Sequence, residues 1–359
     1  MKIAFAALAL SLLSLELAHG AGRPELANAQ EIAPERIGAI VIHYRSGSVV
    51  LQRHNSNTIV VREYLSISDS NFFADIARSG NALVIEAGRR PLTGTFQARL
   101  EVFIPASIKD AEIRSSSGRV EILGGHVFSS LDVESSSGRV SVDSVSADEV
   151  NIRSSSGRIS VNSIDANRID IRSSSGAIEL GAVNRAAGAS AEALGENATS
   201  SFSVRSSSGR VSADSIAAGR VNIQNSSGRI SVNSVTANML SANSSSGAIE
   251  LGMVSGSADI GSSSGRVHST FTENAGNVSI TTGSGSVTLG LPRALAFNFS
   301  SRSSSGSLRT PFDDRLFRPL ADRNSAQGVV GSGSALGGEI SRNVDIRTRS
   351  GSIRVNWVN

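Results

Sequence analysis

A serine-glycine turn recurs along most of this 359-residue chain and constrains its fold more than any other feature. The turn usually reads Ser-Ser-Ser-Gly or Ser-Ser-Gly, and most successive glycines are 18–21 residues apart. The best-formed turns have their glycines at Gly118, Gly138, Gly157, Gly176, Gly209, Gly228, Gly247 and Gly265, with looser copies at Gly285, Gly306 and Gly351. A repeat of this length indicates a solenoid, because one unit cannot bury its apolar face alone and must stack on its neighbours.

Between the turns, apolar and polar residues alternate with a period of two. Val150 and Ile152 alternate with Asn151 and Arg153, and the pattern resumes after the turn at Ile159. This alternation is typical of half-buried β-strands. We expect each turn glycine to reverse the chain at a corner by adopting a positive φ, which costs glycine little.

The period and the alternation together predict an all-β chain, a single-stranded parallel β-helix (solenoid) of about 19-residue coils, each rising ~4.8 Å on the last. Residues 133–183 match residues 204–254 at a constant offset of 71, which indicates that several coils were duplicated together. A run of antiparallel hairpins is the alternative fold. Near-identical residues at near-constant spacing favour coils stacked in register.

The first residues predict export. Met1-Lys2, an apolar run to Leu15 and the small residues around His19 make residues 1–20 a secretory signal peptide, cleaved after Gly20. An uncleaved anchor is the alternative, but the run is short for a span of about 20 residues. We therefore expect a periplasmic, cell-surface or secreted protein with no integral membrane span after cleavage. The chain has no cysteine, so packing and backbone pairing must supply its stability without disulfides.

The rest of the chain divides by its patterns. Residues 21–36 lack periodicity and are predicted to be a flexible mature N-terminus. Residues 37–110 alternate without an evident Ser-Gly repeat, so we expect an atypical N-terminal β cap that covers the first coil. The β-solenoid repeats follow at 111–310, then a loop excursion at 311–338 and a C-terminal coil at 339–359.

Arginines form the sharpest chemical pattern. One row directly follows the turn glycine: Arg119, Arg139, Arg158, Arg210, Arg229 and Arg266. A second row lies four residues before it: Arg114, Arg153, Arg172, Arg205, Arg302 and Arg347. Both rows should point outward, and guanidinium groups suit phosphate and carboxylate partners. The first row is our candidate ligand-binding site for an anionic polymer or glycan; the alternative is a solvated face that keeps the rod soluble.

Other chemistry is poorly represented. The formal charge of +3 gives no reason to expect a nucleic-acid partner, and no cofactor motif occurs. His43, His54, His126 and His268 lack the spacing of metal ligands, so we expect them on the surface or in the cap. Gly261-Ser-Ser-Ser-Gly265 fits the G-x-S-x-G nucleophile pattern only as one copy of the structural repeat. We predict a protein that is not an enzyme, with a polysaccharide-active β-helix enzyme as the remaining alternative.

Three segments resemble a known family. Residues 100–105 (LEVFIP), 111–122 (AEIRSSSGRVEI) and 344–355 (VDIRTRSGSIRV) are similar to a bacterial adhesin-like family, catalogued as a domain of unknown function with β-strand repeats. The family is akin to the head domains of autotransporter adhesins. The resemblance spans roughly residues 37–359. It implies an exported or envelope-associated β-solenoid with an adhesive or scaffold role and a possible surface-protein partner.

Overall fold

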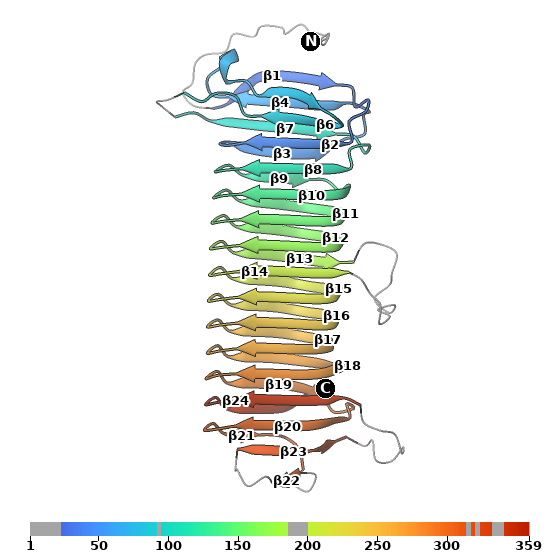
Figure 1. Ribbon diagram of the computed structural model, residues 1–359, viewed down its shortest axis with the longest axis vertical. Coiled ribbons are helices and arrows are strands. Elements are labelled where there is room, and N and C mark those ends of the chain that lie inside the picture. Colours follow the sequence, from blue (N-terminus) through green and yellow to red (C-terminus); the bar gives the residue numbers. More distant parts are fainter. Residues whose placement is uncertain are drawn as a thin grey trace.

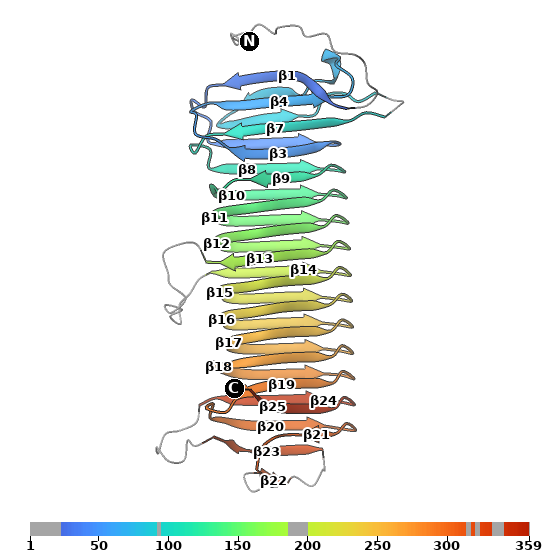
Figure 2. The same cartoon turned by 180° about the vertical axis from the view of Figure 1, so that it is seen from behind.

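The chain forms a rod of stacked β coils in the computed structural model, which describes residues 23–91, 95–185, 200–313, 317–319, 324–331 and 341–358. Strands run across the rod axis, and the turns line one long edge (Figures 1 and 2). Neighbouring coils pair in parallel and in register through the body of the rod, as between residues 140–154 and 159–173. The predicted parallel β-solenoid is therefore confirmed. The expected signal peptide lies outside the described residues.

The body of the rod is built by strands that lie between successive turns. In the longest coils a single strand of 14–16 residues makes the whole circuit. The strands are β8 (Asp110–Ser115), β9 (Val120–Leu123), β10 (His126–Ser135), β11 (Val140–Ser154), β12 (Ile159–Ser173), β13 (Ile178–Asn184), β14 (Ser201–Ser206), β15 (Val211–Asn225), β16 (Ile230–Ser244), β17 (Ile249–Ser262), β18 (Val267–Thr282) and β19 (Val287–Pro292).

Each coil bends at two corners within its strand. In β12 the buried residues follow every second position, except for steps of three from Val161 to Ile164 and from Ala166 to Ile169. At each longer step two successive side chains face outward, which turns the strand toward the next side of the coil. Identical register in the next coil then places aliphatic side chains over one another, and they form one continuous core.

The turn glycines form a stack along the edge of the rod. A Cβ atom added to Gly157 would lie 1.7 Å from the carbonyl oxygen of Gly138, and each following turn glycine meets the one before it in the same way. Only Gly47 among the stacked glycines has a positive φ. Our expectation that a positive φ requires these glycines is wrong. The requirement is close contact between the backbones of neighbouring coils.

A row of small polar side chains lies buried beside the glycines, three residues before each one. The hydroxyl of Ser154 donates to the carbonyl of Gly157 at 3.1 Å, and the hydroxyl of Ser262 accepts from the amide of Gly265 at 2.8 Å. Asn225 takes the same position and bonds Gly209 and Gly228. The row therefore satisfies backbone groups of the turn that would otherwise be buried without partners.

The first coil of the stack comes from the segment that we assigned to the cap. Strands β2 (Ala39–Tyr44) and β3 (Ser48–Arg53) flank Gly47, and they pair in parallel with β8 and β9. The added Cβ of Gly118 would lie 1.4 Å from the carbonyl oxygen of Gly47. Ser46-Gly47 is therefore a turn of the same series. Our assignment of all of 37–110 to an atypical cap is wrong, because a solitary Ser-Gly pair far from the other turns hides this coil in the sequence.

The cap lies beyond this first coil and joins it through parallel strand pairs, while the pairs within the cap are antiparallel. It contains β1 (Glu25–Ile32), β4 (Ile59–Leu65), a short 3-10 helix (Ser70–Phe72), β5 (Asp75–Ser79), β6 (Ala82–Glu86) and β7 (Ala98–Ile104). β4 pairs antiparallel with both β1 and β7, and β5 pairs antiparallel with β6. Residues 21–36 are thus not simply a flexible tail, since β1 forms an outer strand that covers the edge of β4.

The C-terminal coil also lies inside the stack. Strands β24 (Asn343–Thr348) and β25 (Ile353–Val358) insert between β18/β19 and the last coil, formed by β20 (Phe297–Ser303) and β21 (Leu308–Arg309). Gly351 accordingly stacks between Gly285 and Gly306. Figure 1 shows the C-terminus beside β19, away from the end of the rod.

The described parts of the expected loop at 311–338, residues 311–313, 317–319 and 324–331, lie at the C-terminal end of the rod. β23 (Ser325–Val330) pairs antiparallel with β20 and with β22 (Phe317–Pro319). The ring of Phe312 packs edge-on against Phe299 and Trp357, with ring centroids 5.1 and 5.0 Å apart. Part of this segment is therefore cap structure, and our description of it as a loop excursion is incomplete.

Replacing one glycine of the stack should strongly destabilise the rod. We expect Gly157→Ala to lower the free energy of unfolding by about 3 kcal/mol or more, because its methyl group would overlap a backbone carbonyl that cannot move aside. Gly125→Ala is the matched control, since its Cβ would lie 3.7 Å from the nearest atom, the Ser144 hydroxyl. Urea unfolding of both variants measures the effect. Equal stability of the two would contradict the stacking argument.

His126 is buried at the start of β10, contrary to our expectation of a surface or cap site. Its ring stacks on Phe128 with centroids 5.0 Å apart, and burial lowers the pKa of His126 from 6.5 to about 4. The neutral ring is therefore favoured in the folded protein. Its contribution to stability is complete above pH about 6.5 and is lost as the pH falls toward 4.

Acid should destabilise the protein partly through His126. Between pH 7.5 and 4 we expect wild-type protein to lose about 3 kcal/mol more stability than His126→Phe, because only the unfolded wild-type chain gains this proton. Urea unfolding of both proteins at the two pH values gives the difference. An equal loss in both proteins would show that His126 does not titrate on unfolding.

Candidate functional site

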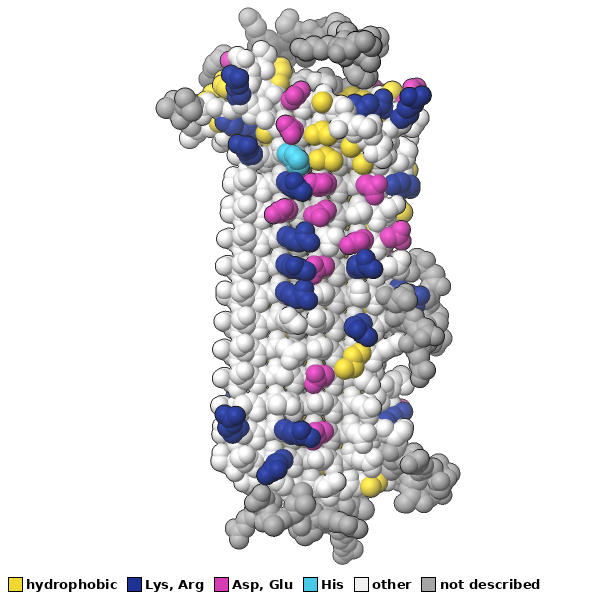
Figure 3. Space-filling model, in the orientation of Figure 1, with side chains coloured by type: hydrophobic (Ala, Val, Ile, Leu, Met, Phe, Trp, Pro, Cys, Tyr) yellow, Lys and Arg dark blue, Asp and Glu magenta, His cyan; other side chains and the backbone are white. Residues whose placement is uncertain are grey.

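A long shallow groove runs along one edge of the rod, beside the glycine turns. It has a volume of about 1040 Å³ and spans eight coils, with side chains from Glu134 to Thr281 along it. Its lining is polar: apart from glycine it contains only serine, threonine, asparagine, glutamine and charged residues. The face that carries it is shown in Figure 3, where uncharged side chains form regular columns along the turn edge.

Two rows of outward side chains make the two banks of the groove. The first bank, which we call the front row, holds the residue four before each turn glycine: Glu134, Arg153, Arg172, Arg205, Gln224, Asn243, Gly261 and Thr281. The second bank, the serine row, holds the residue two before it: Ser155, Ser174, Ser207, Ser226, Ser245 and Ser263. Most front-row side chains are long and those of the serine row are small. The row of buried small polar side chains, three residues before each glycine, lies between the two banks.

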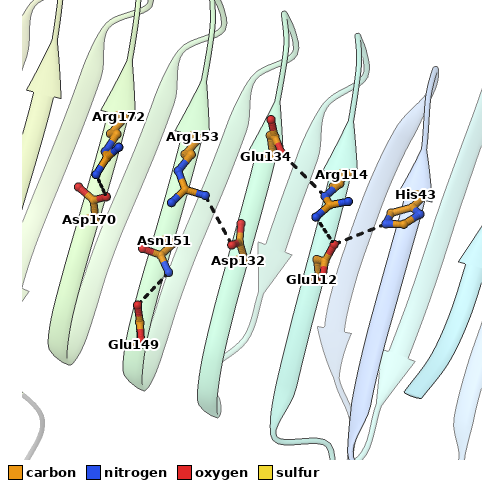
Figure 4. A network of polar contacts seen from close by, with 10 residues as sticks. All are labelled: His43, Glu112, Arg114, Asp132, Glu134, Glu149, Asn151, Arg153, Asp170 and Arg172. Atoms are coloured by element: carbon orange, nitrogen blue, oxygen red, sulfur yellow. Dashed lines mark hydrogen bonds and ion pairs between the residues drawn. The ribbon is translucent and has the colours of Figure 1, made fainter. Parts of the chain in front are cut away.

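Ion pairs neutralise most arginines of the front row. Arg172 lies 2.8 Å from Asp170 and Arg153 lies 3.7 Å from Asp132 (Figure 4). Arg205 also reaches Asp170, at 3.9 Å. Exposed pairs of this kind contribute only about 0–1 kcal/mol each, so they balance the charge of this bank without adding much stability.

The carboxylates of this face are crowded near the first coils. Partial burial raises the pKa of Asp132, and Glu112 and Glu134 raise it further, while Arg153 and Arg114 lower it. Arg114 lies 2.9 Å from Glu112 and 3.8 Å from Glu134. Charge of both signs is therefore balanced in the upper part of the groove, and the surface from Gln224 to Thr281 carries few charges (Figure 3).

The arginine row predicted as the ligand site does not line this groove. It lies on the other side of the turns, where strands leave them; we call it the back row. Three of its arginines meet carboxylates: Arg119 with Glu121 at 3.0 Å, Arg158 with Glu179 at 3.5 Å and Arg229 with Glu250 at 3.5 Å. Arg139, Arg210 and Arg266 have no ion pair within 4.0 Å among the described residues.

Sequence reasoning missed both the groove and these pairs. Glu179 and Glu250 occur in the coils where alanine replaces the back-row arginine, at Ala177 and Ala248. Each carboxylate accepts the arginine of the preceding coil, which alignment of the repeats in register could have revealed. The groove has a sequence signal too, because the residue two before the glycine is a serine in most coils while the residue four before it is long.

Besides His126, a buried carboxylate and tyrosine lie close together where the first coil meets the cap. The carboxylate of Glu63 accepts hydrogen bonds from the Tyr44 hydroxyl at 2.9 Å and from the Ala74 amide at 2.7 Å. Burial raises the pKa of Glu63 and also raises that of Tyr44. Among the described residues, no cluster of three His, Cys, Asp or Glu could hold a metal ion. No helix in the described part of the chain is long and apolar enough to cross a membrane.

Several solved structures share similarity with the chain at low identity. A "putative cell adhesion protein" from Clostridium sporogenes is 9% identical, with 92% of this chain and 98% of that chain covered and a TM-score of 0.19. A "putative adhesin" from Parabacteroides merdae is 12% identical over 74% of this chain and 96% of that one, with a TM-score of 0.42. Another from Parabacteroides distasonis is 13% identical over 74% and 90%, with a TM-score of 0.40.

These superpositions are too loose to carry an argument about this chain. Comparison with curated proteins gives no match. The model of the family described as Toastrack DUF4097 matches twice, over residues 37–195 and 190–356. The two matches overlap at residues 190–195, and the described stack passes from the first match to the second through the pairings of β12 with β14 and β13 with β15. The expected membership of a β-repeat family of unknown function is confirmed: the chain belongs to the Toastrack DUF4097 family.

Proposed function

We propose that this protein is an exported, non-enzymatic rod at the bacterial cell envelope, with an adhesin-like role in which the groove binds an extended glycan. The observation that carries the proposal is the groove itself, which repeats one polar binding surface over eight coils. A repeating surface suits a repeating ligand. The signal-peptide pattern of residues 1–20 supports export, and the family resemblance supports an adhesive role.

A polymer along the groove would make many weak contacts. Five successive coils, from Arg153 to Asn243, each offer a serine hydroxyl on one bank and a polar front-row side chain on the other, at intervals of ~4.8 Å. Individually weak contacts become strong when one ligand engages several at once. Aromatic residues make up only 4% of the chain, and none lines the groove. The contacts would therefore be hydrogen bonds to sugar hydroxyls rather than stacking on sugar rings.

Blocking the serine row should weaken glycan binding. We expect the double variant Ser226→Trp/Ser245→Trp to bind at least about tenfold more weakly, because two indole rings would fill the middle of the groove. The control is Ser227→Trp/Ser246→Trp, which places the same rings on exposed neighbours that do not line the groove. Immobilised bacterial envelope polysaccharides, tested as a panel by biolayer interferometry, provide the measurement. Absence of binding to every polysaccharide, or equal binding by both variants, would reject the proposal.

A second candidate function rests on the back row. Arg139, Arg210 and Arg266 are exposed and lack carboxylate partners among the described residues, so this face keeps a positive charge. It could bind an anionic envelope polymer, as the sequence first suggested. The neutralised arginines Arg119, Arg158 and Arg229 would contribute less.

Removing the unpaired arginines tests this second function. The triple variant Arg139→Ala, Arg210→Ala and Arg266→Ala should lose most retention on dextran sulfate, since it removes three uncompensated charges and alanine occupies the same position at Ala177 and Ala248. Wild-type retention should fall as salt rises from 0.05 to 0.5 M, because screening weakens contacts between exposed charges. Uncharged dextran is the control ligand. Retention that is unchanged in the variant would exclude this row.

A further inference from the structure

A pocket lined by three arginines adjoins the groove near the C-terminal end of the rod, and it shares Ser262, Ser263 and Thr281 with the groove. It has a volume of about 540 Å³, and Arg302, Arg347 and Arg349 line it together with serine and threonine side chains. Figure 3 shows a second group of basic side chains at this end of the face, separated from the upper group by a nearly uncharged stretch. The pocket lies where the inserted C-terminal coil meets the last coil, because β24 carries Arg347 and β20 carries Arg302.

The arginines of this pocket are less compensated than those of the front row above it. Arg347 lies 2.8 Å from Asp345, whereas Arg302 and Arg349 have no ion pair within 4.0 Å among the described residues. Arg302 and Arg347 are direct partners on neighbouring parallel strands. Like charges in that arrangement repel each other. An anion bound between the two guanidinium groups would therefore reduce this electrostatic repulsion.

Arg349 differs from the residue that the other groove coils carry at the same position. It stands two before the turn glycine, where the coils of the groove carry serine, and its neighbours in the stack at that position are small: Gly283 and Ser304. A long cationic side chain between two small residues leaves space on both sides of it. The pocket thus lies where arginine replaces the serine two before the turn glycine, next to Arg302 and Arg347, which stand four before their own glycines.

We propose that this pocket binds a phosphate monoester carried on a sugar. Three arginines and Asp345 give a local formal charge of +3 − 1 = +2, which matches the charge of about −1.5 to −2 on a phosphate monoester at pH 7. Guanidinium groups bind phosphate oxygens in pairs of parallel hydrogen bonds. The pocket exceeds the needs of a bare ion and falls within the usual 300–1,000 Å³ of small-molecule sites. Ser284 and Ser304 supply hydroxyls for the sugar.

Calorimetric titration with glucose 6-phosphate at low salt tests the site. We expect wild-type protein to bind, and Arg349→Ser and Arg302→Gln each to weaken binding at least tenfold. Both substitutions introduce residue types that occupy equivalent positions in other coils, such as Ser226 and Gln224, so the fold should persist. Unchanged thermal unfolding without ligand checks this. Arg220→Ser is the matched control, since it removes one exposed charge at a position where the preceding coil has Ser201.

Three further ligands separate the sources of affinity. Glucose 6-sulfate, with one negative charge, should bind more weakly than glucose 6-phosphate, and glucose should not bind. Inorganic phosphate should bind more weakly because it lacks the sugar contacts. Equal affinity for phosphate and its sugar ester, equal affinity for the sulfate ester, or an equal loss in Arg220→Ser would each overturn the proposal. The site does not depend on glycan binding in the main groove, so Ser226→Trp/Ser245→Trp should leave this titration unchanged.

Discussion

Close contact between successive turn backbones sets the geometry of the whole rod. At Gly157 the neighbouring carbonyl leaves no room for a Cβ atom, and the same contact recurs from Gly118 through Gly306. Because every coil is held to its neighbour at this edge, the parallel hydrogen-bond ladder stays in register over the remaining residues of the coil. Register in turn places each core residue over its equivalent in the next coil, and gives every outward position a continuous row.

The same stacking explains why chain order and spatial order differ at both ends. A solenoid with bare ends would expose strand edges that could pair with other molecules. Here the first coil, at Gly47, is covered by β6 and β7, which come later in the chain and pair with it in parallel, and the coil at Gly351 is covered by the earlier one at Gly306. Beyond these coils β4 pairs antiparallel with β7 and β23 pairs antiparallel with β20, so each end finishes in antiparallel structure. An aromatic cluster around Phe312 fills the core where aliphatic stacking stops.

The sequence predicted the features that recur in every coil and did not predict those that occur in single coils. The period of the turns and the alternation of residues were sufficient to predict the parallel solenoid, because every coil repeats the same physical requirement. The coils at Gly47 and Gly351 occur out of order, so spacing along the chain could not place them. The role of the turn glycines was also misassigned. A glycine required by close contact between coils looks the same in the sequence as a glycine required by a positive φ. The pairs of Arg158 with Glu179 and of Arg229 with Glu250 needed coil-to-coil register to be seen.

Differences between coils come from departures within rows, since the rows themselves follow from folding. The serine two before the glycine has a small side chain, which leaves the groove open beside the turns. The residue four before the glycine can vary because its side chain faces solvent. Variation along that row changes the groove from balanced charge near Arg153, through neutral amides, to uncompensated charge near Arg302. One further change, arginine for serine at position 349, converts an open bank into a pocket. Recognition can therefore be altered coil by coil, while the glycines and the buried row keep the scaffold unchanged.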